Sequence, residues 1–298
     1  MSGYREQDDN ESSAFGLLGT IRDVHDREGG NTWQQFAAEL RRVRVAAGLS
    51  QTTYWSEVDV VDLTGATLID FDFANSHIGD VTFRAAQFHG ETVFCFARLT
   101  KAEFADAEFF GPTSFQNARF TLAAQFNRAR FSEDVVFSKV RIDGNGSFEE
   151  TQFFGVVWFD DARLPDLTSL KSTRFHDHAS FESAELRMIW LLGARFYGGA
   201  TFHGSQLTEI KTDDPLDPAQ PIWVGLDVPN SRPSSWPPGY IVQPAIHPPD
   251  EPIGRWSHLV RAPNSKKSTN AKKNGGEQRG DPTSCTAVPT PPGDHLSF

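Results

Sequence analysis

Large apolar residues recur at every fifth or sixth position from Leu63 to Leu207, and this spacing constrains the fold more than any other feature of the chain. An α-helix places apolar residues about 3.6 positions apart and a strand places them two apart, so neither element explains the pattern. A small residue, often alanine, stands two positions before most of the large ones, as Ala86 stands before Phe88. We infer that the chain turns a corner at each unit and points one large and one small side chain inward.

The large residues separate by type when they are assigned in order to four columns. The third column contains only phenylalanine: Phe73, Phe94, Phe115, Phe137, Phe159, Phe181 and Phe202. The fourth column is nearly all aliphatic: Ile78, Leu99, Phe120, Ile142, Leu164, Leu186 and Leu207. The second column is mostly phenylalanine (Leu68, Phe88, Phe109, Phe131, Phe153, Phe175, Phe196), and the first is mixed (Leu63, Phe83, Phe104, Phe126, Phe148, Leu170, Leu191). This separation predicts seven coils of four units, which at about 4.8 Å per coil give a rod about 34 Å long.

Several units resemble the pentapeptide-repeat family: GATLI, FANSH, FADAE, QNARF and NRARF. The resemblance implies an all-β solenoid, a right-handed four-sided parallel β-helix. This chain differs from the strict family pattern because it is rich in phenylalanine and often inserts a sixth residue. The resemblance is specific for fold and implies little about function.

The regions outside the repeat differ from it in composition. The polar composition of residues 1–31 predicts a largely disordered lead. The pattern of residues 32–56 predicts an amphipathic helix that caps the N-terminal coil. The solenoid is expected over 57–212. Proline-rich chain over 213–261 predicts an irregular segment, in which the apolar run from Ile222 to Leu226 is able to pack on the last coil, and 262–298 predict a disordered tail.

The stretch from Phe36 to Gln51 also resembles the start of a Cro/Xre-type helix-turn-helix domain. The recognition helix that this family places in the major groove does not follow, since the chain continues into the first coil. We therefore interpret the stretch as a cap, with a DNA-linked regulator as an alternative.

The charge balance and the N-terminus bear on location and partners. The formal net charge is −11, so we do not expect direct nucleic-acid binding. The sequence has no long apolar run and its first residues lack the features of a signal peptide, so we expect a cytoplasmic protein without membrane contact. Cys95 and Cys285 stand far apart and predict no disulfide framework. The sequence does not indicate an oligomeric state.

Candidate chemical groups are sparse. His176 and His178 could share one face of a strand, but the spacing supplies no third metal ligand. The pairs Glu149–Glu150 and Asp160–Asp161 fall on opposite faces of the four-sided register. They therefore cannot lie on either side of one substrate bond, as a catalytic pair of carboxylates would. Phosphate-binding, nucleophile-elbow and zinc-protease motifs are absent from the sequence. We expect no enzymatic activity, no catalytic residues, no cofactor and no metal.

Arginine is the most regular outward residue. The position before the fourth column holds Arg98, Arg119, Arg141 and Arg163, and the position before the second column holds Arg130, Gln152, Arg174 and Arg195. Stacked guanidinium groups repel one another unless acids or a ligand intervene. These arginines therefore either form an anion-binding partner surface or pair locally with carboxylates, with Asp143 and Asp166 as candidates.

Three functions are consistent with these features. The first is a scaffold that binds a protein partner, still to be identified, through its flat faces. The second follows from the resemblance: some pentapeptide-repeat proteins mimic DNA and modulate type II topoisomerases such as gyrase. The third is the DNA-linked regulator described above.

Overall fold

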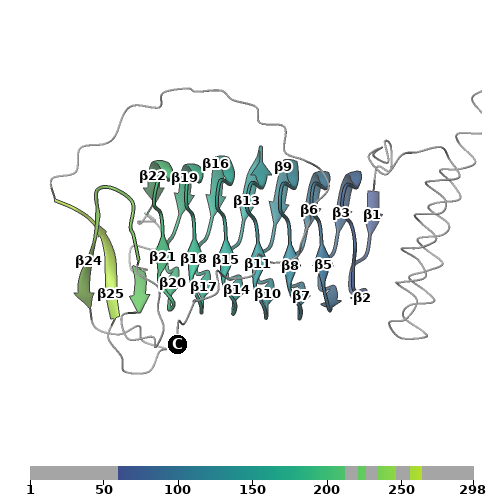
Figure 1. The fold of residues 1–298 in the computed structure, drawn as a ribbon, viewed down its shortest axis with the longest axis horizontal. Coiled ribbons are helices and arrows are strands. Elements are labelled where there is room, and N and C mark those ends of the chain that lie inside the picture. Colours follow the sequence, from purple (N-terminus) through teal and green to yellow (C-terminus); the bar gives the residue numbers. More distant parts are fainter. Residues whose placement is uncertain (1–59, 212–220, 226–233, 246–255, 264–298) are drawn as a thin grey trace, which may run out of the picture.

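The computed structural model describes residues 60–211, 221–225, 234–245 and 256–263. All regular elements in these ranges are strands, and those of residues 60–211 wind into a parallel solenoid (Figure 1). In the sheet that begins with β1, the path from β1 to β22 joins eight strands and so delimits seven turns. The expected all-β solenoid of seven coils is therefore confirmed.

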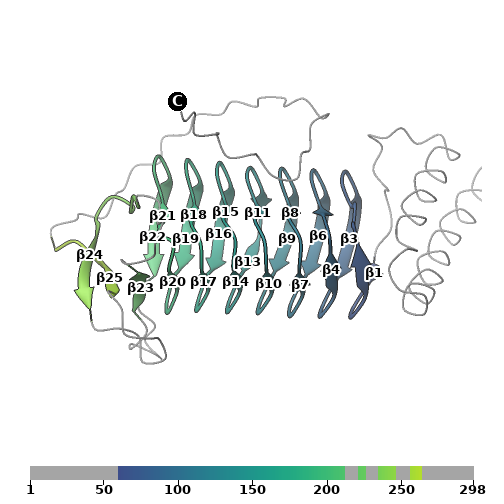
Figure 2. The same ribbon diagram turned by 60° about the horizontal axis from the view of Figure 1, so that its bottom comes forward.

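The strands form three sheets that run along the rod (Figures 1 and 2). Sheet A contains β1 (Val60–Asp62), β3 (His77–Thr82), β6 (Arg98–Glu103), β9 (Arg119–Gln125), β12 (Arg141–Ile142), β13 (Asn145–Ser147), β16 (Arg163–Ser169), β19 (Glu185–Trp190) and β22 (Gln206–Lys211). Sheet B contains β2 (Thr67–Ile69), β4 (Gln87–His89), β7 (Glu108–Phe109), β10 (Arg130–Phe131), β14 (Gln152–Phe153), β17 (Arg174–Phe175), β20 (Arg195–Phe196), β23 (Ile222–Gly225), β25 (Trp256–Arg261) and β24 (Tyr240–Ala245). Sheet C contains β5 (Thr92–Val93), β8 (Thr113–Ser114), β11 (Val135–Val136), β15 (Val157–Trp158), β18 (Ala179–Ser180) and β21 (Ala200–Thr201).

Sheet A is broad because most of its strands carry two repeat units through a corner without a break. In β6, for example, Leu99 of the fourth column and Ala102, which precedes the first column, are both buried. Only in the fourth coil are the two units separate strands, β12 and β13. The division of the coil into four flat sides and its right hand remain predictions.

The strand register matches the four columns. Second-column partners lie 20, 21 or 22 residues apart, as in Leu68↔Phe88, Phe88↔Phe109 and Phe109↔Phe131. Fourth-column residues pair in the same way, for example Ile78↔Leu99. Each large residue thus lies beside its equivalent in the next coil.

Stacked rings fill the interior. Phe137 lies 4.8 Å from both Phe115 and Phe159, with the ring planes 1° and 3° from parallel. It also meets first-column Phe126 edge to face, with centroids 5.5 Å apart. Both geometries are favourable for aromatic pairs, so the columns are held together along the rod and across it.

Two corners of each coil are made by left-handed residues. Phe96, Arg128 and Lys139 have φ near +58°, a conformation that costs an L-residue about 1–2 kcal/mol. Hydrogen bonds to the next coil offset this cost, since the Arg128 amide donates to Glu149 O at 2.8 Å. The following small residue closes the turn, as the Ala129 amide donates to Phe126 O at 2.9 Å.

Glycine is required where one coil crosses close to another. A Cβ atom on Gly111 would lie 2.1 Å from the backbone oxygen of Gly90. The same holds at Gly155, where a Cβ would lie 2.5 Å from the Glu133 carbonyl carbon. This corner, which follows the second column, therefore excludes side chains in these coils.

The first coil departs from the ideal column. Phe71 stands where later coils have a small residue, and its ring is fully buried. It stacks on Phe73 at 5.3 Å. Phe73 is only partly buried and meets Phe94 at 75° rather than in parallel, so the third-column stack begins at Phe94.

The expectation of irregular chain over 213–261 is wrong for the described residues. β23 extends sheet B parallel to β20, and β25 pairs antiparallel with both β23 and β24. Ile222, Val224 and Leu259 are buried because the last coil leaves an apolar edge that these strands cover. The prediction that the run beginning at Ile222 packs on the last coil is confirmed.

Other predictions fall outside the described residues. These are the lead (1–31), the capping helix (32–56), the helix-turn-helix resemblance at Phe36–Gln51 and the tail beyond residue 263. In the described ranges, no helix has the length and apolar character needed to cross a membrane.

Candidate partner surface

The arginines before the fourth column form one straight file along sheet A, which we call the sheet A arginine column. Arg98 pairs with Arg119, Arg119 with Arg141, and Arg141 with Arg163 in the strand register. The side chains of Arg119, Arg141 and Arg163 are 44, 45 and 54% exposed. The column continues at Glu185, the register partner of Arg163.

Asp143 neutralises part of this column. Arg119 Nη2 lies 2.7 Å from Asp143 Oδ2, and Arg141 Nε contacts Asp143 Oδ1. Partial burial acts to raise the pKa of Asp143, but the hydrogen bonds from Arg141 and Arg119 outweigh it, so its pKa lies below the ordinary value. Asp143 is thus the pairing carboxylate that the sequence suggested.

Arg163 has a weaker contact with an acid. Its Nε lies 3.7 Å from Glu185 Oε1, and both side chains are about half exposed. The other suggested partner, Asp166, lies in β16, and the structure describes its backbone alone. Two carboxylates therefore serve three guanidinium groups, and exposed pairs of this kind contribute about 0–1 kcal/mol each.

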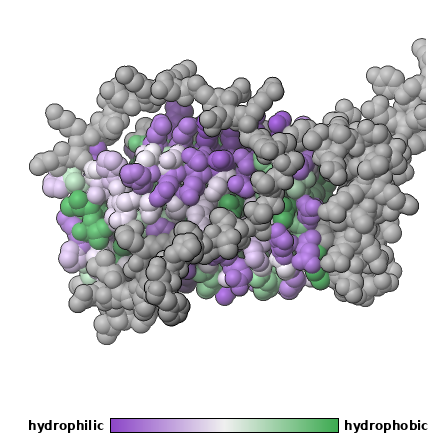
Figure 3. All heavy atoms as spheres, viewed as in Figure 1, coloured by the Kyte–Doolittle hydropathy of each residue, from purple (hydrophilic) through white to green (hydrophobic). Residues whose placement is uncertain are grey.

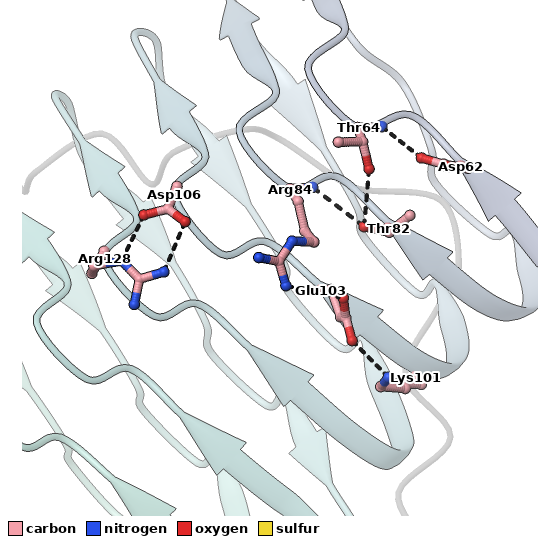
Figure 4. Close-up of polar contacts among 8 residues, drawn as sticks. All are labelled: Asp62, Thr64, Thr82, Arg84, Lys101, Glu103, Asp106 and Arg128. Carbon is pink, nitrogen blue, oxygen red and sulfur yellow. Dashed lines mark hydrogen bonds and ion pairs between the residues drawn. The ribbon is translucent and has the colours of Figure 1, made fainter.

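A second set of charges lies near the first column and is paired both between coils and within a strand (Figure 4). Arg128 forms a bidentate pair with Asp106, with contacts of 2.6 and 2.8 Å, and these hydrogen bonds lower the pKa of Asp106. Lys101 lies 2.6 Å from Glu103, whose hydrogen bond raises the pKa of the lysine. Glu103 is also 3.9 Å from Arg84. These cations lie outside the sheet A arginine column and are held in local pairs.

The position before the second column also forms a file, on sheet B. Arg130 pairs with Gln152, Gln152 with Arg174, and Arg174 with Arg195. Arg130 is exposed, and its Cζ lies 4.3 Å from the centroid of the Phe154 ring. A guanidinium over a ring face is a cation–π contact.

An outward file of rings lies beside these arginines and was not predicted from the sequence. The position after the second column holds Ile69, His89, Phe110, Ser132, Phe154, His176 and Tyr197. His176 lies 4.3 Å from Phe154 and 4.8 Å from Tyr197, nearly parallel to both. A signal was present: a second-column phenylalanine is followed by another ring in Phe109–Phe110, Phe153–Phe154 and Phe196–Tyr197.

Several polar groups of the described residues lie outside the arginine files. Across the described ranges no group of three His, Cys, Asp or Glu residues could hold a metal ion. His178 Nε2 lies 3.0 Å from Thr201 Oγ1, whereas His176 belongs to the outward ring file. Cys95 is disulfide-bonded, whereas the sequence predicted no disulfide framework.

The paired carboxylates lie at different corners of one coil. Glu149 follows the first column and accepts a hydrogen bond from Ser169 Oγ at 2.7 Å. Asp160 follows the third column and accepts a hydrogen bond from Ser180 Oγ, and burial raises its pKa. Each side chain has a structural partner at its own corner.

The surface in Figure 3 is hydrophilic over much of the central rod, and hydrophobic residues gather at the end formed by β24 and β25. The arrangement as a whole offers straight files of like side chains on a stiff rod. Such a surface suits binding along its flank.

Comparison with known proteins identifies the repeat. The family described as pentapeptide repeats (9 copies) matches residues 115–163 and 159–206. Neither the curated proteins nor the solved structures returned a match. The family match gives no support to the helix-turn-helix resemblance, since it lies wholly within the solenoid. The seven turns and the inward columns agree with this match, so residues 115–206 of the solenoid are pentapeptide repeats.

Proposed function

We propose that this chain is a non-enzymatic scaffold, a right-handed four-sided rod that binds a protein partner through an outward face. The single observation that carries the proposal is the sheet A arginine column, in which four arginines occupy successive coils in register. Equivalent residues of neighbouring coils lie about 4.8 Å apart. A stiff core beneath them fixes these positions, so a bound partner need not order the surface.

The charge of this column favours an anionic partner surface. Asp143 contacts Arg119 and Arg141, Glu185 contacts Arg163, and these contacts are at the protein surface. Electrostatic complementarity of this kind guides encounter and orientation more than it adds affinity. We therefore expect binding that weakens as salt concentration rises.

DNA mimicry fits this surface less well. A mimic of DNA displays carboxylates where DNA displays phosphates, and the net charge of −11 agrees with that requirement. The sheet A arginine column presents the opposite sign along one side of the rod. The scaffold proposal is therefore preferred, and topoisomerase inhibition by the purified protein is the result that would favour mimicry.

The test uses a photo-crosslinking residue at Thr121, which is exposed on β9 next to the arginine column, and at Lys139, exposed at another corner. We expect crosslinks to a protein from position 121 and few from 139. The double variant Arg119→Gln, Arg141→Gln should abolish the crosslink. The matched control, Arg84→Gln with Arg128→Gln, removes equal charge outside the column and should keep it.

Stability of the same variants separates binding from folding. Loss of exposed pairs should change the free energy of unfolding by no more than about 1 kcal/mol. Equal crosslinking from both positions, or a crosslink that survives the Arg119 and Arg141 changes, would contradict the proposal.

A further inference from the structure

The outward rings on sheet B form two stacked groups with a break between them. His89 lies 4.6 Å from Phe110, and Phe154 stacks on His176 at 4.3 Å. Ser132 occupies the same file in the coil between Phe110 and Phe154. Those two rings are therefore two coils apart, roughly 10 Å, which leaves room for one flat group at the spacing of the file.

Arg130 lies on the Phe154 side of that room. It lies two residues before Ser132 on the same outward side of the strand, since the intervening Phe131 points into the core. Its Cζ atom is 4.3 Å from the Phe154 centroid. We call the space bounded by Phe110, Ser132 and Phe154 the Ser132 slot, with Arg130 as its present occupant.

The occupant and one wall of the slot are exposed, and the other wall, Phe154, is half-buried. Arg130 is exposed, and Phe110 is 40% exposed, one of four exposed large hydrophobic residues in the described ranges. An exposed cation–π contact is among the weaker interactions in proteins. An aromatic ring placed in the slot would instead have both faces covered by phenylalanine, in the parallel geometry that the rest of the file adopts.

The flanking charges define what should accompany that ring. Displacement of Arg130 from Phe154 releases a guanidinium beside the slot, and the same file holds Arg174 two coils further on. On the other side Arg130 is next to Glu108 in the register, and Glu133 follows Ser132. A carboxylate would therefore be attracted on the side of Arg130 and Arg174 and repelled on the side of Glu108.

We propose that the Ser132 slot binds one aromatic side chain of a protein partner, carried on an extended acidic segment. The ring enters between Phe110 and Phe154, and a neighbouring carboxylate pairs with Arg130. This inference deepens the scaffold proposal by naming the chemistry of a partner segment, and it uses a different side of the rod from the sheet A arginine column.

The binding test uses the purified full chain and two fluorescein-labelled peptides with acids on one side only, Gly-Asp-Asp-Trp-Ser-Ser-Gly and Gly-Ser-Ser-Trp-Asp-Asp-Gly, with fluorescence anisotropy as the readout. We expect saturable binding that weakens with salt, and a loss of roughly tenfold or more when alanine replaces the tryptophan. A peptide with lysine in place of aspartate should also bind much more weakly. Equal binding of the alanine peptides, no binding of either tryptophan peptide, or preferred binding of oligothymidylate would overturn the proposal.

Substitutions locate the binding to the slot. Ser132→Tyr places a ring in the file and should reduce peptide affinity by roughly tenfold or more without lowering the melting temperature. Ser138→Tyr is the matched control, since Ser138 is a half-buried serine at another corner of the same coil, and it should bind as the original chain does. Arg130→Gln should weaken the binding of the acidic peptides but keep the preference for tryptophan over alanine.

Unchanged affinity in Ser132→Tyr, or an equal loss in Ser138→Tyr, would show that the slot does not bind the peptide. The peptide assay needs no sheet A partner, so it can fail while position 121 still crosslinks, and the reverse also holds. The two proposals are therefore tested separately.

Discussion

The solenoid and the C-terminal strands β23–β25 bury similar apolar side chains by different means. In the solenoid each inward side chain packs on the equivalent side chains of the two neighbouring coils, as Phe137 does on Phe115 and Phe159. In the C-terminal part, Trp256 reaches back across the chain to Tyr197 at 5.3 Å, and β25 runs antiparallel to its neighbours. The solenoid is thus built from repeated nearest-neighbour contacts, whereas the C-terminal strands are a single non-repeating closure of one sheet.

This difference assigns distinct roles to the two parts. A parallel solenoid ends in an unpaired strand edge, which is open to pairing with other chains. β23 pairs with β20 and is itself covered by β25, so sheet B does not end at the last coil. Trp236 adds apolar cover, since its ring lies 5.5 Å from Phe196 and 5.9 Å from Phe202. Damage to the solenoid should therefore spread along the rod, and damage to β23–β25 should stay at one end.

The largest effect is expected from Phe137→Ala in the middle of the solenoid. The ring is fully buried, and its removal should cost about 3–5 kcal/mol in chemical denaturation. Phe137→Leu, which keeps most of the volume, should cost clearly less. A loss under about 1 kcal/mol for the alanine variant would count against the stacked core.

Trp256→Ala tests the other side of the comparison. Its loss should cost the C-terminal strands about 3 kcal/mol, because the ring is buried against Tyr197 and Trp223. Hydrogen exchange should then speed up in β23–β25 and stay slow in the central coils. Equal acceleration throughout would show that the two parts unfold as one unit.

Gly111→Ala examines the close crossing of neighbouring coils. The new Cβ would meet Gly90 O at 2.1 Å, and relief of such overlap should cost about 1–3 kcal/mol. Gly146→Ala provides the control, since the equivalent inward positions in the two preceding coils are Ala102 and Ala124. Similar losses in the free energy of unfolding at both glycines would mean that close contact between coils is not the reason for glycine at position 111.

The smallest effect concerns His258 in β25, which faces Trp223 of β23 at 4.3 Å and pairs in register with Gln243 of β24. Burial lowers the pKa of His258 below its ordinary 6.5. The unfolded strand then binds the proton more readily, so the C-terminal strands lose stability as pH falls below about 6.5. Exchange rates in β25 measured between pH 7.5 and 5.5 should show this dependence, and His258→Gln should remove it. An unchanged pH profile in that variant would assign the effect to another group.

The two parts also differ in how far the sequence predicts them. The columns could be predicted because each inward position repeats after one coil, so that residues such as Phe115 and Phe137 identify each other. The contact between Trp256 and Tyr197 has no such repeat, and composition suggested irregular chain instead. Phe71 shows the same limit inside the solenoid, because within the described residues the first coil has a neighbouring coil on one side only.

Side-chain detail on the surface was predictable only in part. The positions of the arginines follow from the columns, and Asp143 is close to Arg141 in sequence. The stacking of Arg130 on Phe154 depends on Ser132 in the coil between two rings, and it becomes visible only when the outward file is aligned in space. To predict contacts at outward positions, one therefore has to know the strand register and then the side chains that stand in the neighbouring coils.

The distance between outward positions of the sheet A arginine column tests the account most directly, because every proposal depends on that register. Spin labels attached to p-acetylphenylalanine at positions 98 and 163, and at 98 and 206, are separated by three and five coils. We expect backbone separations of about 14 and 24 Å, with a rise of about 4.8 Å per coil. Distances that do not increase by equal steps from coil to coil would contradict the register and, with it, the straight arginine column.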